Sequence, residues 1–448
     1  MISPLFANSD ARIDDFRKSE DGALTALGLY LFVAMAMIGA IAVDVSNLFA
    51  ARSQLQVAAD TAGHAALYFR DRHDAAASKV KAVEMARAGM PHARYGNILV
   101  EEDITFGSWD YDTQVFTPDA NSRESVMVAT SRISDKSNSI GSLLFQFIGK
   151  SDWDVITPAV FTTFRPTCFR EGLVGDGVVD IQSNNGFTNG FCVHSNEYVS
   201  VNSNNIFESG TIVSMPNSSD IDLPRSGFET NDGLQAALRS GVYRLRILNK
   251  LNDIEDDLLS GDLTAKNMPD FITDATVVPF RGNNTRLDET DFTPGRVHTL
   301  NCGQGGRLTL TPSGSGTPFS TFALVTNCEI KFAQGTVLED VVIFTNHTGS
   351  RSMNSPSSFQ IGRDDNCADG GGARLLTRGS VVFAAGLKVF GSQVLALHDI
   401  EFEAIANGIM GLAMVAGGTI DATSNSNMGF CGSGMGDNYE AEYFRLAI

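Results

Sequence analysis

An uncharged apolar run passes without a break into a polar segment that keeps helical spacing. Residues 23–43 contain no Asp, Glu, Lys or Arg, and at a rise of 1.5 Å per residue a helix of this length crosses about 30 Å of hydrocarbon. Beyond it, Leu48, Leu55, Ala62 and Phe69 recur every seven residues. The spacing predicts one continuous helix, whose first part spans a membrane and whose second part buries an apolar stripe outside it.

Three basic residues before the run set its orientation. Arg12, Arg17 and Lys18 precede it, and the positive-inside rule keeps such a flank in the cytoplasm. The interspersed acidic residues count little in that rule. The sequence therefore predicts a single-pass membrane protein, with a cytoplasmic tail at residues 1–22, a transmembrane helix at 23–43 and the bulk of the chain on the far side of the membrane.

A cleaved signal peptide is the alternative to a retained anchor. Ala40-Ile41-Ala42 fits the small-x-small pattern of a cleavage site. Against cleavage, the apolar run is longer than the usual core of a signal peptide, and the helical pattern crosses the site without a break. We therefore favour a retained anchor.

The segment after the apolar run resembles a known family. Residues 42–67, AVDVSNLFAARSQLQVAADTAGHAAL, are similar to the N-terminal segment of the TadG-like proteins of the tight-adherence (Flp) pilus assembly system. The matching positions are Ala42, Val43, Asp44, Ala51, Arg52, Gln54, Leu55, Gln56, Ala58, Ala59, Asp60 and Ala62. The resemblance implies a non-catalytic pilus assembly factor or minor pilin-like component of the bacterial inner membrane, with the bulk of the chain in the periplasm. Its helix would pack with other pilus or pseudopilin components, and no cofactor is expected.

The resemblance extends over about residues 12–166 and implies an α+β pilin-like module. A stem helix is expected at 44–95, bent near Gly63 or around residues 70–75. A small β-rich domain follows at 96–167, with three strands, a short helix within 140–150 and a last strand, all antiparallel and packed on the stem. The predicted interaction residues of the stem are Leu48, Arg52, Gln54, Leu55, Gln56 and Asp60. Arg52 and Asp60 are expected to pair either with a partner stem or with the protein's own sheet.

One position departs from the pilins of this system. Those proteins carry a peptidase site, a Gly followed by an apolar segment with Glu at the fifth position. Here Gly22 is followed by Ala23, and the fifth position is Leu27. This departure from the family's peptidase site indicates a chain that is not processed at Gly22.

The pattern of apolar and turn-forming residues changes in the last two thirds of the chain. Very short apolar strands alternate with Asn, Gly and Ser turns from residue 168 onward. This pattern predicts a mainly-β domain at 168–448, a parallel β-solenoid; a β-sandwich or jelly roll is the alternative. Leucines at helical spacing predict an amphipathic helical insertion at 231–260.

The six cysteines all lie on one side of the membrane segment. An even number in that position suits disulfides in an oxidising compartment. We favour sequential pairing among the possible connectivities, with buried free thiols as the alternative. The expected pairs are Cys168 with Cys192, Cys302 with Cys328, and Cys367 with Cys431.

Composition and motifs identify no catalytic site. The net charge of −19 disfavours nucleic acid as a partner. Asp364, Asp365 and Asp369 are candidate Ca²⁺ ligands, but they lack the spacing of known calcium loops, so we predict a turn and no metal. A membrane-tethered carbohydrate-binding adhesin or polysaccharide-active enzyme is the alternative function, with carboxylate pairs such as Asp176 and Asp180, or Asp399 and Glu401, on one face of the β domain.

Overall fold

The chain forms two compact units. The computed structural model describes residues 21–281, 285–303, 306–314, 316–432 and 435–447, so nearly all of the predicted cytoplasmic tail lies outside the described residues. The first unit, here the stem unit, comprises Met1–Phe164 and Phe444–Ile448. The second, here the ladder unit, comprises Arg165–Tyr443 and is inserted between two segments of the first.

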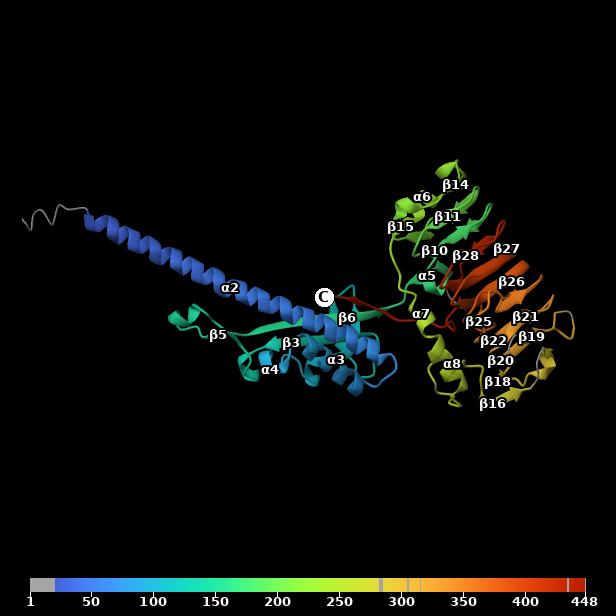
Figure 1. Ribbon diagram of the computed structural model, residues 1–448, viewed down its shortest axis with the longest axis horizontal. Coiled ribbons are helices and arrows are strands. Elements are labelled where there is room, and N and C mark those ends of the chain that lie inside the picture. Colours follow the sequence, from blue (N-terminus) through green and yellow to red (C-terminus); the bar gives the residue numbers. More distant parts are fainter. Residues whose placement is uncertain (1–20, 282–284, 304–305, 315, 433–434, 448) are drawn as a thin grey trace, which may run out of the picture. The chain divides into compact units, whose positions relative to one another are not determined.

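The stem unit is built on one long helix. α2 (Asp21–Arg70) is 50 residues long and runs without interruption past Ala40–Ala42 and Gly63 (Figure 1). It is the one helix among the described residues that is long and apolar enough to span a membrane. The apolar run and the polar stem are therefore one element, as the helical spacing predicts.

The predicted stem helix at 44–95 is broken after Arg70. α3 (Ala75–Gly89) and α4 (His92–Tyr95) follow as separate helices. The break has a local cause, because Asp74 caps α3: its Oδ1 accepts the backbone N–H of Ala77 at 2.7 Å. The prediction of a bend around residues 70–75 is therefore confirmed, whereas the bend near Gly63 is absent.

An antiparallel sheet covers the stripe of α2. Its strands, in the order β2-β1-β3-β6-β30, are β1 (Ile104–Asp110), β2 (Val115–Pro118), β3 (Ser125–Arg132), β6 (Val155–Phe164) and β30 (Tyr443–Leu446). Leu55, Ala59 and Ala62 are fully buried in a core shared with this sheet. A side chain at Gly63 would meet the Phe161 ring at 2.8 Å, so the glycine permits the close approach. The sheet explains why a polar helix continues from the apolar run.

The predicted helix within 140–150 is reduced to one turn. β4 (Ile140–Gly141) and β5 (Asp152–Trp153) form a small antiparallel hairpin. A four-residue 3-10 turn, η3 (Phe145–Ile148), lies between them and ends at Gly149, whose φ is +91°. Shorter 3-10 turns elsewhere in the unit are η1 (Glu101–Asp103) and η2 (Ser134–Lys136).

The ladder unit is dominated by a 23-stranded sheet whose described strand pairs are parallel. Its first half contains β7 (Gly172–Gly175), β8 (Val179–Ile181), β9 (Gly186–Phe187), β10 (Cys192–Ser195), β11 (Val199–Val201), β12 (Asn205–Phe207), β13 (Ile212–Met215), β14 (Asn231–Asp232) and β15 (Leu238–Ser240). The short helix α5 (Thr167–Arg170) precedes these strands, and the turns η4 (Ser218–Asp220) and η5 (Gly227–Thr230) lie among them.

The remaining strands of the sheet include the two longest, of 16 and 17 residues. They are β16 (Asp274–Phe280), β17 (Thr285–Leu287), β18 (Arg296–Leu300), β19 (Arg307–Leu310), β20 (Phe319–Thr326), β21 (Glu329–Phe332), β22 (Val337–Thr345), β23 (Met353–Ser355), β24 (Gln360–Ile361), β25 (Ala373–Thr377), β26 (Val381–Ala396), β27 (Ile400–Ala416), β28 (Ile420–Asp421) and β29 (Asn427–Gly429). The turn η6 (Glu289–Asp291) follows β17. A mainly-β domain with a parallel sheet is therefore confirmed.

The two halves join in an order that differs from the order of the sequence. One continuous series of parallel pairs runs β16-β18-β20-β22-β25-β26-β27-β7-β10-β13-β15. The last long strand thus pairs with the first strand, with Ala413 opposite Gly172. The chain leaves one end of the series at β15 and re-enters at the other end at β16.

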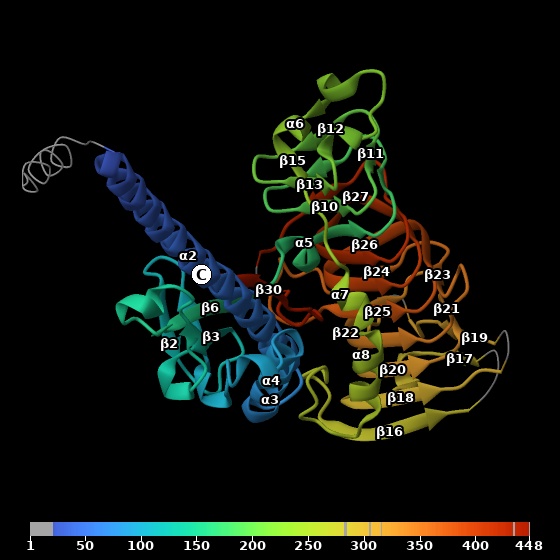
Figure 2. The same cartoon turned by 60° about the vertical axis from the view of Figure 1, so that its left-hand side comes forward.

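The segment between β15 and β16 is helical only in part. α6 (Leu234–Ala237), α7 (Arg246–Asn249) and α8 (Leu251–Leu259) are separate helices, and α7 and α8 lie along the sheet in Figure 2. The single helix predicted across 231–260 is wrong, because Leu238 joins the sheet opposite Val213. Strand pairing by the backbone at this position prevents the continuous helix that the leucine spacing predicts.

Side chains inside the sheet stack from strand to strand. The rings of Phe332 and Phe359 are stacked 4.3 Å apart, and those of Phe187 and Phe207 are 4.7 Å apart. Buried asparagines repeat in the same way, since Asn205 Oδ1 accepts the N–H of Asn185 at 2.8 Å. Each layer therefore depends on its neighbours for burial and for hydrogen bonds.

Three disulfides staple the ladder unit. The bonds are Cys168–Cys192, Cys302–Cys328 and Cys367–Cys431, which is the sequential pairing favoured from the sequence. The first two close loops of 24 and 26 residues, close to the length that separates successive layers. Each disulfide of this kind typically adds about 2–4 kcal/mol to stability.

Candidate functional site

An open groove lies on the stem unit beside the point where the apolar run of α2 ends. Its volume is about 410 Å³. The residues that line this stem groove are Val45, Leu48, Phe49, Arg52, Trp153, Asp154, Val155 and Ile156. Phe49 is 65 % exposed and Ile156 is 59 % exposed. Large apolar side chains that are exposed in this way mark an interaction surface.

Two rigid elements form the walls of the stem groove. Val45, Phe49 and Arg52 lie on one face of α2, because residues three and four apart are neighbours on a helix. The opposite wall is fixed by hydrogen bonds: Trp153 Nε1 donates to Ser142 Oγ at 2.7 Å, and Asp154 Oδ1 accepts the N–H of Ser134 at 2.7 Å. The groove thus offers an apolar floor with one cation and one carboxylate at its rim, a surface suited to a helix with a mixed apolar and polar face.

The structure separates the six residues predicted for interaction by the stem. Leu48 and Arg52 line the stem groove, and Gln54 is exposed on another face of α2. Gln56 Nε2 donates to Asp60 Oδ1 at 2.7 Å, so Asp60 has a partner within its own helix. Leu55 is fully buried in the core of the stem unit, so it is a core residue with no surface left for a partner.

Phe49, Trp153 and Ile156 were missed by the sequence reasoning. Phe49 carried a signal, since it follows Leu48 directly on a helix otherwise rich in alanine. Trp153 and Ile156 carried none, because only the pairing of β6 with β3 brings their segment beside α2. A groove between a helix and a strand cannot be found from either segment alone.

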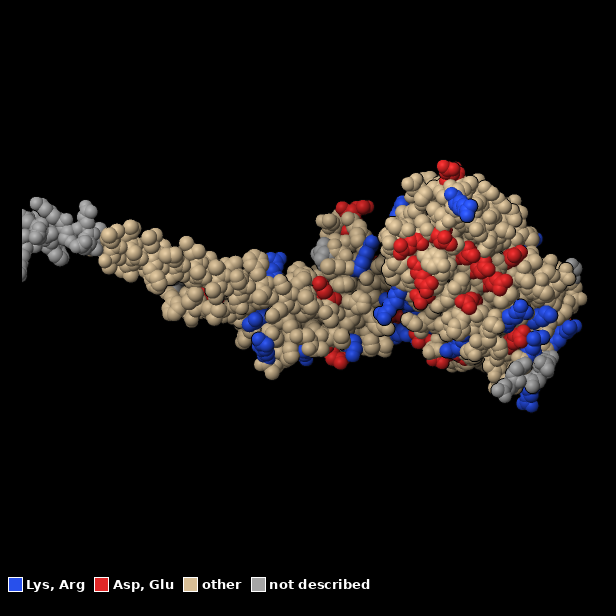
Figure 3. Space-filling view, turned by 45° about the horizontal axis from the view of Figure 1, so that its top comes forward, with Lys and Arg blue, Asp and Glu red and all other residues tan. Residues whose placement is uncertain are grey.

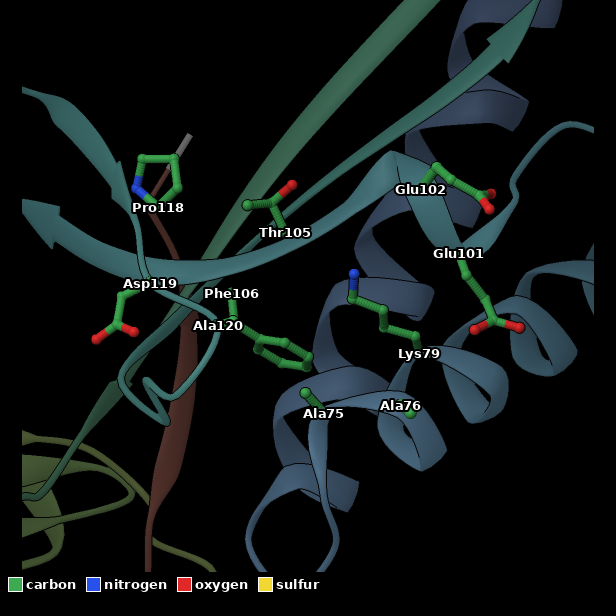
Figure 4. A pocket seen from close by; sticks show the side chains of 10 residues that line it. All are labelled: Ala75, Ala76, Lys79, Glu101, Glu102, Thr105, Phe106, Pro118, Asp119 and Ala120. Atoms are coloured by element: carbon green, nitrogen blue, oxygen red, sulfur yellow. The ribbon is translucent and has the colours of Figure 1, made fainter.

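A second cavity of about 540 Å³ opens on the stem unit beside α3. Lys79 reaches into its middle, with Glu101 and Glu102 on one side and Phe106 on the other (Figure 4). The lining holds no histidine, cysteine or serine, and its ammonium and carboxylates are ordinary surface groups. We assign no chemistry to it.

Acidic side chains gather on one face of the ladder unit (Figure 3). The register of the parallel strands aligns Asp180 with Asp421, and Asp421 with Glu401. Burial raises the pKa of Asp180, and the carboxylates of Asp421 and Asp222 raise it further. We call Asp180, Asp222, Glu401 and Asp421 the acidic column. Of the other carboxylates named from the sequence, Asp176 accepts from Asn196 at 2.7 Å and Asp399 from the N–H of Thr419 at 2.8 Å.

A serine–histidine–asparagine chain lies inside the ladder unit. His194 Nδ1 lies 2.7 Å from Ser214 Oγ, and its Nε2 lies 3.0 Å from Asn196 Oδ1. Such a set resembles a nucleophile with its base, but His194 is fully buried and Ser214 is 4 % exposed. Burial also lowers the pKa of His194. No substrate reaches this hydroxyl, so these three hydrogen-bonded residues are part of the core.

The candidate calcium residues do not converge. Asp365 Oδ2 accepts from Arg363 Nε at 2.8 Å and its Oδ1 accepts the N–H of Ala368 at 3.0 Å, while Asp364 and Asp369 are exposed. Among the described residues, no group of three or more His, Cys, Asp or Glu side chains is arranged to hold a metal ion. The loop is a turn held by Arg363 and by the disulfide at Cys367.

Two family models match the chain. Residues 172–432, more than half of the chain, match the family described as a domain of unknown function, DUF7867, and the chain belongs to this family. Residues 22–78 match the TadE/G-like Flp pilus-assembly family, named Tad, which confirms the resemblance seen in the sequence and ties the chain to Flp pilus assembly. No curated protein and no solved structure matches the chain.

Proposed function

We propose that the chain is a single-pass inner-membrane component of the Flp pilus assembly system that acts by helix packing and not by catalysis. Residues 23–43 of α2 cross the membrane, with the tail at residues 1–22 in the cytoplasm and both units in the periplasm. The stem groove receives the helix of another pilin-like component. The observation that carries this proposal is the exposed apolar floor of the groove, directly beyond the membrane segment.

The chemistry of the stem groove supports a helical partner. Val45, Phe49 and Ile156 supply apolar contact, and an amphipathic helix presents its own apolar face at matching intervals of three and four residues. Arg52 at the rim can pair with a carboxylate of the partner, which sets register more than affinity. Leu48, half-buried at the base, connects the groove to the core of the unit.

We infer that the ladder unit is a parallel β-solenoid and not a β-sandwich or jelly roll. Sandwiches and jelly rolls are built from antiparallel strands, whereas the described pairs of this sheet are parallel. Stacked phenylalanines and asparagines between successive layers support the same architecture. A solenoid presents a long surface for further components of the system.

The second candidate is a membrane-tethered carbohydrate-binding adhesin or polysaccharide-active enzyme. The acidic column favours it, since aligned carboxylates serve glycan-cleaving enzymes. Arg286 occupies the equivalent register position on a strand of the same sheet, but several strands away from these acids. Turnover of an acidic or neutral glycan by the purified chain, abolished by Asp180→Asn, would decide for this candidate.

Replacing groove residues is expected to reduce piliation. Phe49→Ala and Arg52→Ala remove the main apolar and the charged contact of the stem groove, and truncation of such a central residue typically costs about 1–2 kcal/mol or more of binding free energy. We expect fewer pili per cell by electron microscopy of the native host. Val57→Ala is the control, because Val57 is equally exposed, at 65 %, and does not line the groove.

Immunoblots of membranes separate loss of binding from loss of protein. We expect normal amounts of both groove variants, since Phe49 and Arg52 are exposed. A pilus count equal to that of the wild type in both variants would refute the role of the stem groove.

A further inference from the structure

The hairpin between β4 and β5 ends in an exposed apolar tip, residues 142–149. Phe147 is 81 % exposed, the highest value among the large apolar side chains of the described residues, and Leu143 is 53 % exposed. Leu144, at 37 %, adds to the same patch. No charged side chain occurs in the tip. Neighbouring exposed apolar side chains of this kind mark a surface that contacts a protein or a membrane.

Asp44 of α2 holds the apolar tip by its backbone. The Asp44 side chain is 1 % exposed. Its carboxylate accepts the N–H groups of Leu143 at 2.7 Å, Leu144 at 3.0 Å and Phe145 at 2.7 Å. Three bonds to one carboxylate fix the position of the tip along the helix, and Figure 1 shows the hairpin lying alongside α2.

The fixed position lies level with the end of the apolar run. Asp44 is the first charged residue after residues 23–43, and helix side chains lean toward the N-terminus. The carboxylate, with the backbone it binds, therefore lies beside the last turn of that run. Ile41 and Val43 in this turn are 49 % and 46 % exposed, so the tip continues the exposed apolar surface of α2.

The neighbours of the tip have the chemistry of a membrane–water interface. Lys150 Nζ lies 5.1 Å from the centroid of the Trp153 ring, and Trp153 donates to Ser142. Tryptophan and lysine concentrate at the level of the lipid headgroups. The bonds to Asp44 also provide acceptors for three backbone N–H groups, which an environment poor in water demands.

We propose that the apolar tip inserts into the interfacial layer of the bilayer beside the point where α2 leaves it. Leu143, Leu144 and Phe147 enter the boundary of the acyl chains, while Lys150 and Trp153 remain among the headgroups. This inference rests on the proposed membrane span at residues 23–43. A second lipid contact limits rotation of α2 about its axis, so it sets the direction in which the stem groove faces within the membrane plane.

A fluorescent probe on the tip tests the insertion. The full chain carrying Phe147→Cys, labelled with an environment-sensitive fluorophore, is reconstituted into phosphatidylcholine–phosphatidylglycerol vesicles. Labelling is selective, since all six native cysteines form disulfides. We expect a blue-shifted emission and about twofold or greater quenching by spin label placed near the headgroups, relative to the same probe on Val115→Cys. Val115 is 53 % exposed on β2 of the same unit.

The outcomes distinguish insertion of the apolar tip from anchoring of the chain by residues 23–43. Equal emission and quenching at positions 147 and 115, in a chain that resists alkaline extraction from the vesicles, would overturn the insertion and leave the anchor standing. Extraction of the chain by alkali would overturn both. A blue shift at position 147 without quenching by the lipid-borne label would indicate a protein contact and would also overturn the proposal.

Discussion

Phe359→Ala is expected to lower the free energy of unfolding of the ladder unit by about 3–5 kcal/mol. Phe359 is 1 % exposed, and its ring lies 4.3 Å from that of Phe332 and 5.1 Å from that of Phe383. It thus fills the space between two neighbouring layers of the sheet. Truncation leaves a cavity that rigid parallel strands cannot close, and each layer depends on the next for burial.

Two spectroscopic signals distinguish unfolding of the two units. The chain has two tryptophans, Trp109 and Trp153, and both lie in the stem unit. In urea titrations of the chain in lipid nanodiscs, Phe359→Ala should shift the β-sheet circular-dichroism transition and leave the tryptophan-fluorescence transition in place. Phe228→Ala, at a side chain that is 37 % exposed, is the control and should shift neither. A wild-type β-sheet transition in Phe359→Ala would contradict the stacked core.

Leu55→Ala is expected to destabilise the stem unit by about 2–5 kcal/mol. Leu55 is fully buried between α2 and the antiparallel sheet, and Thr130 Oγ1 donates to its carbonyl at 2.9 Å. The lost packing lies in the stem unit alone. The same titration should therefore shift the tryptophan-fluorescence transition and leave the β-sheet transition unchanged.

This substitution also tests the reassignment of Leu55 from partner contact to core. Val57→Ala removes an exposed side chain two residues away and should leave stability within about 0.5 kcal/mol of the wild type. If Leu55 instead contacted a partner, Leu55→Ala would reduce piliation without shifting either unfolding transition of the purified chain.

Local patterns in the sequence predict much of the fold. The seven-residue spacing of Leu48, Leu55 and Ala62 marks the helix and its stripe, and the even set of cysteines fits the observed disulfides. The order in which the strands of the ladder unit pair with one another was not predictable in this way. Asn185 Oδ1 accepts the N–H of Ser426, which is 241 residues away, and no local pattern states which strand edges join across such a distance.

The candidate site was predictable only in part, for a related reason. A stripe of apolar residues on a helix shows that the stripe is buried, but not which element covers it. Leu55 is covered by the protein's own sheet, whereas Phe49, six residues earlier, lines an open groove beside the start of β6 and remains exposed. The position of the hairpin that contains Trp153 depends on the bonds to Asp44, a contact between segments far apart in sequence.

Site-specific photo-crosslinking from position 49 in native membranes tests whether the stem groove binds the helix of another pilus component. A benzophenone amino acid replaces Phe49 in one strain and Val57 in a matched strain, and mass spectrometry identifies the adducts. We expect an adduct at position 49 with the helix of another Flp pilus component, and no such adduct at position 57. The absence of pilus components from the adducts at position 49, or the same adducts at both positions, would contradict docking through the stem groove.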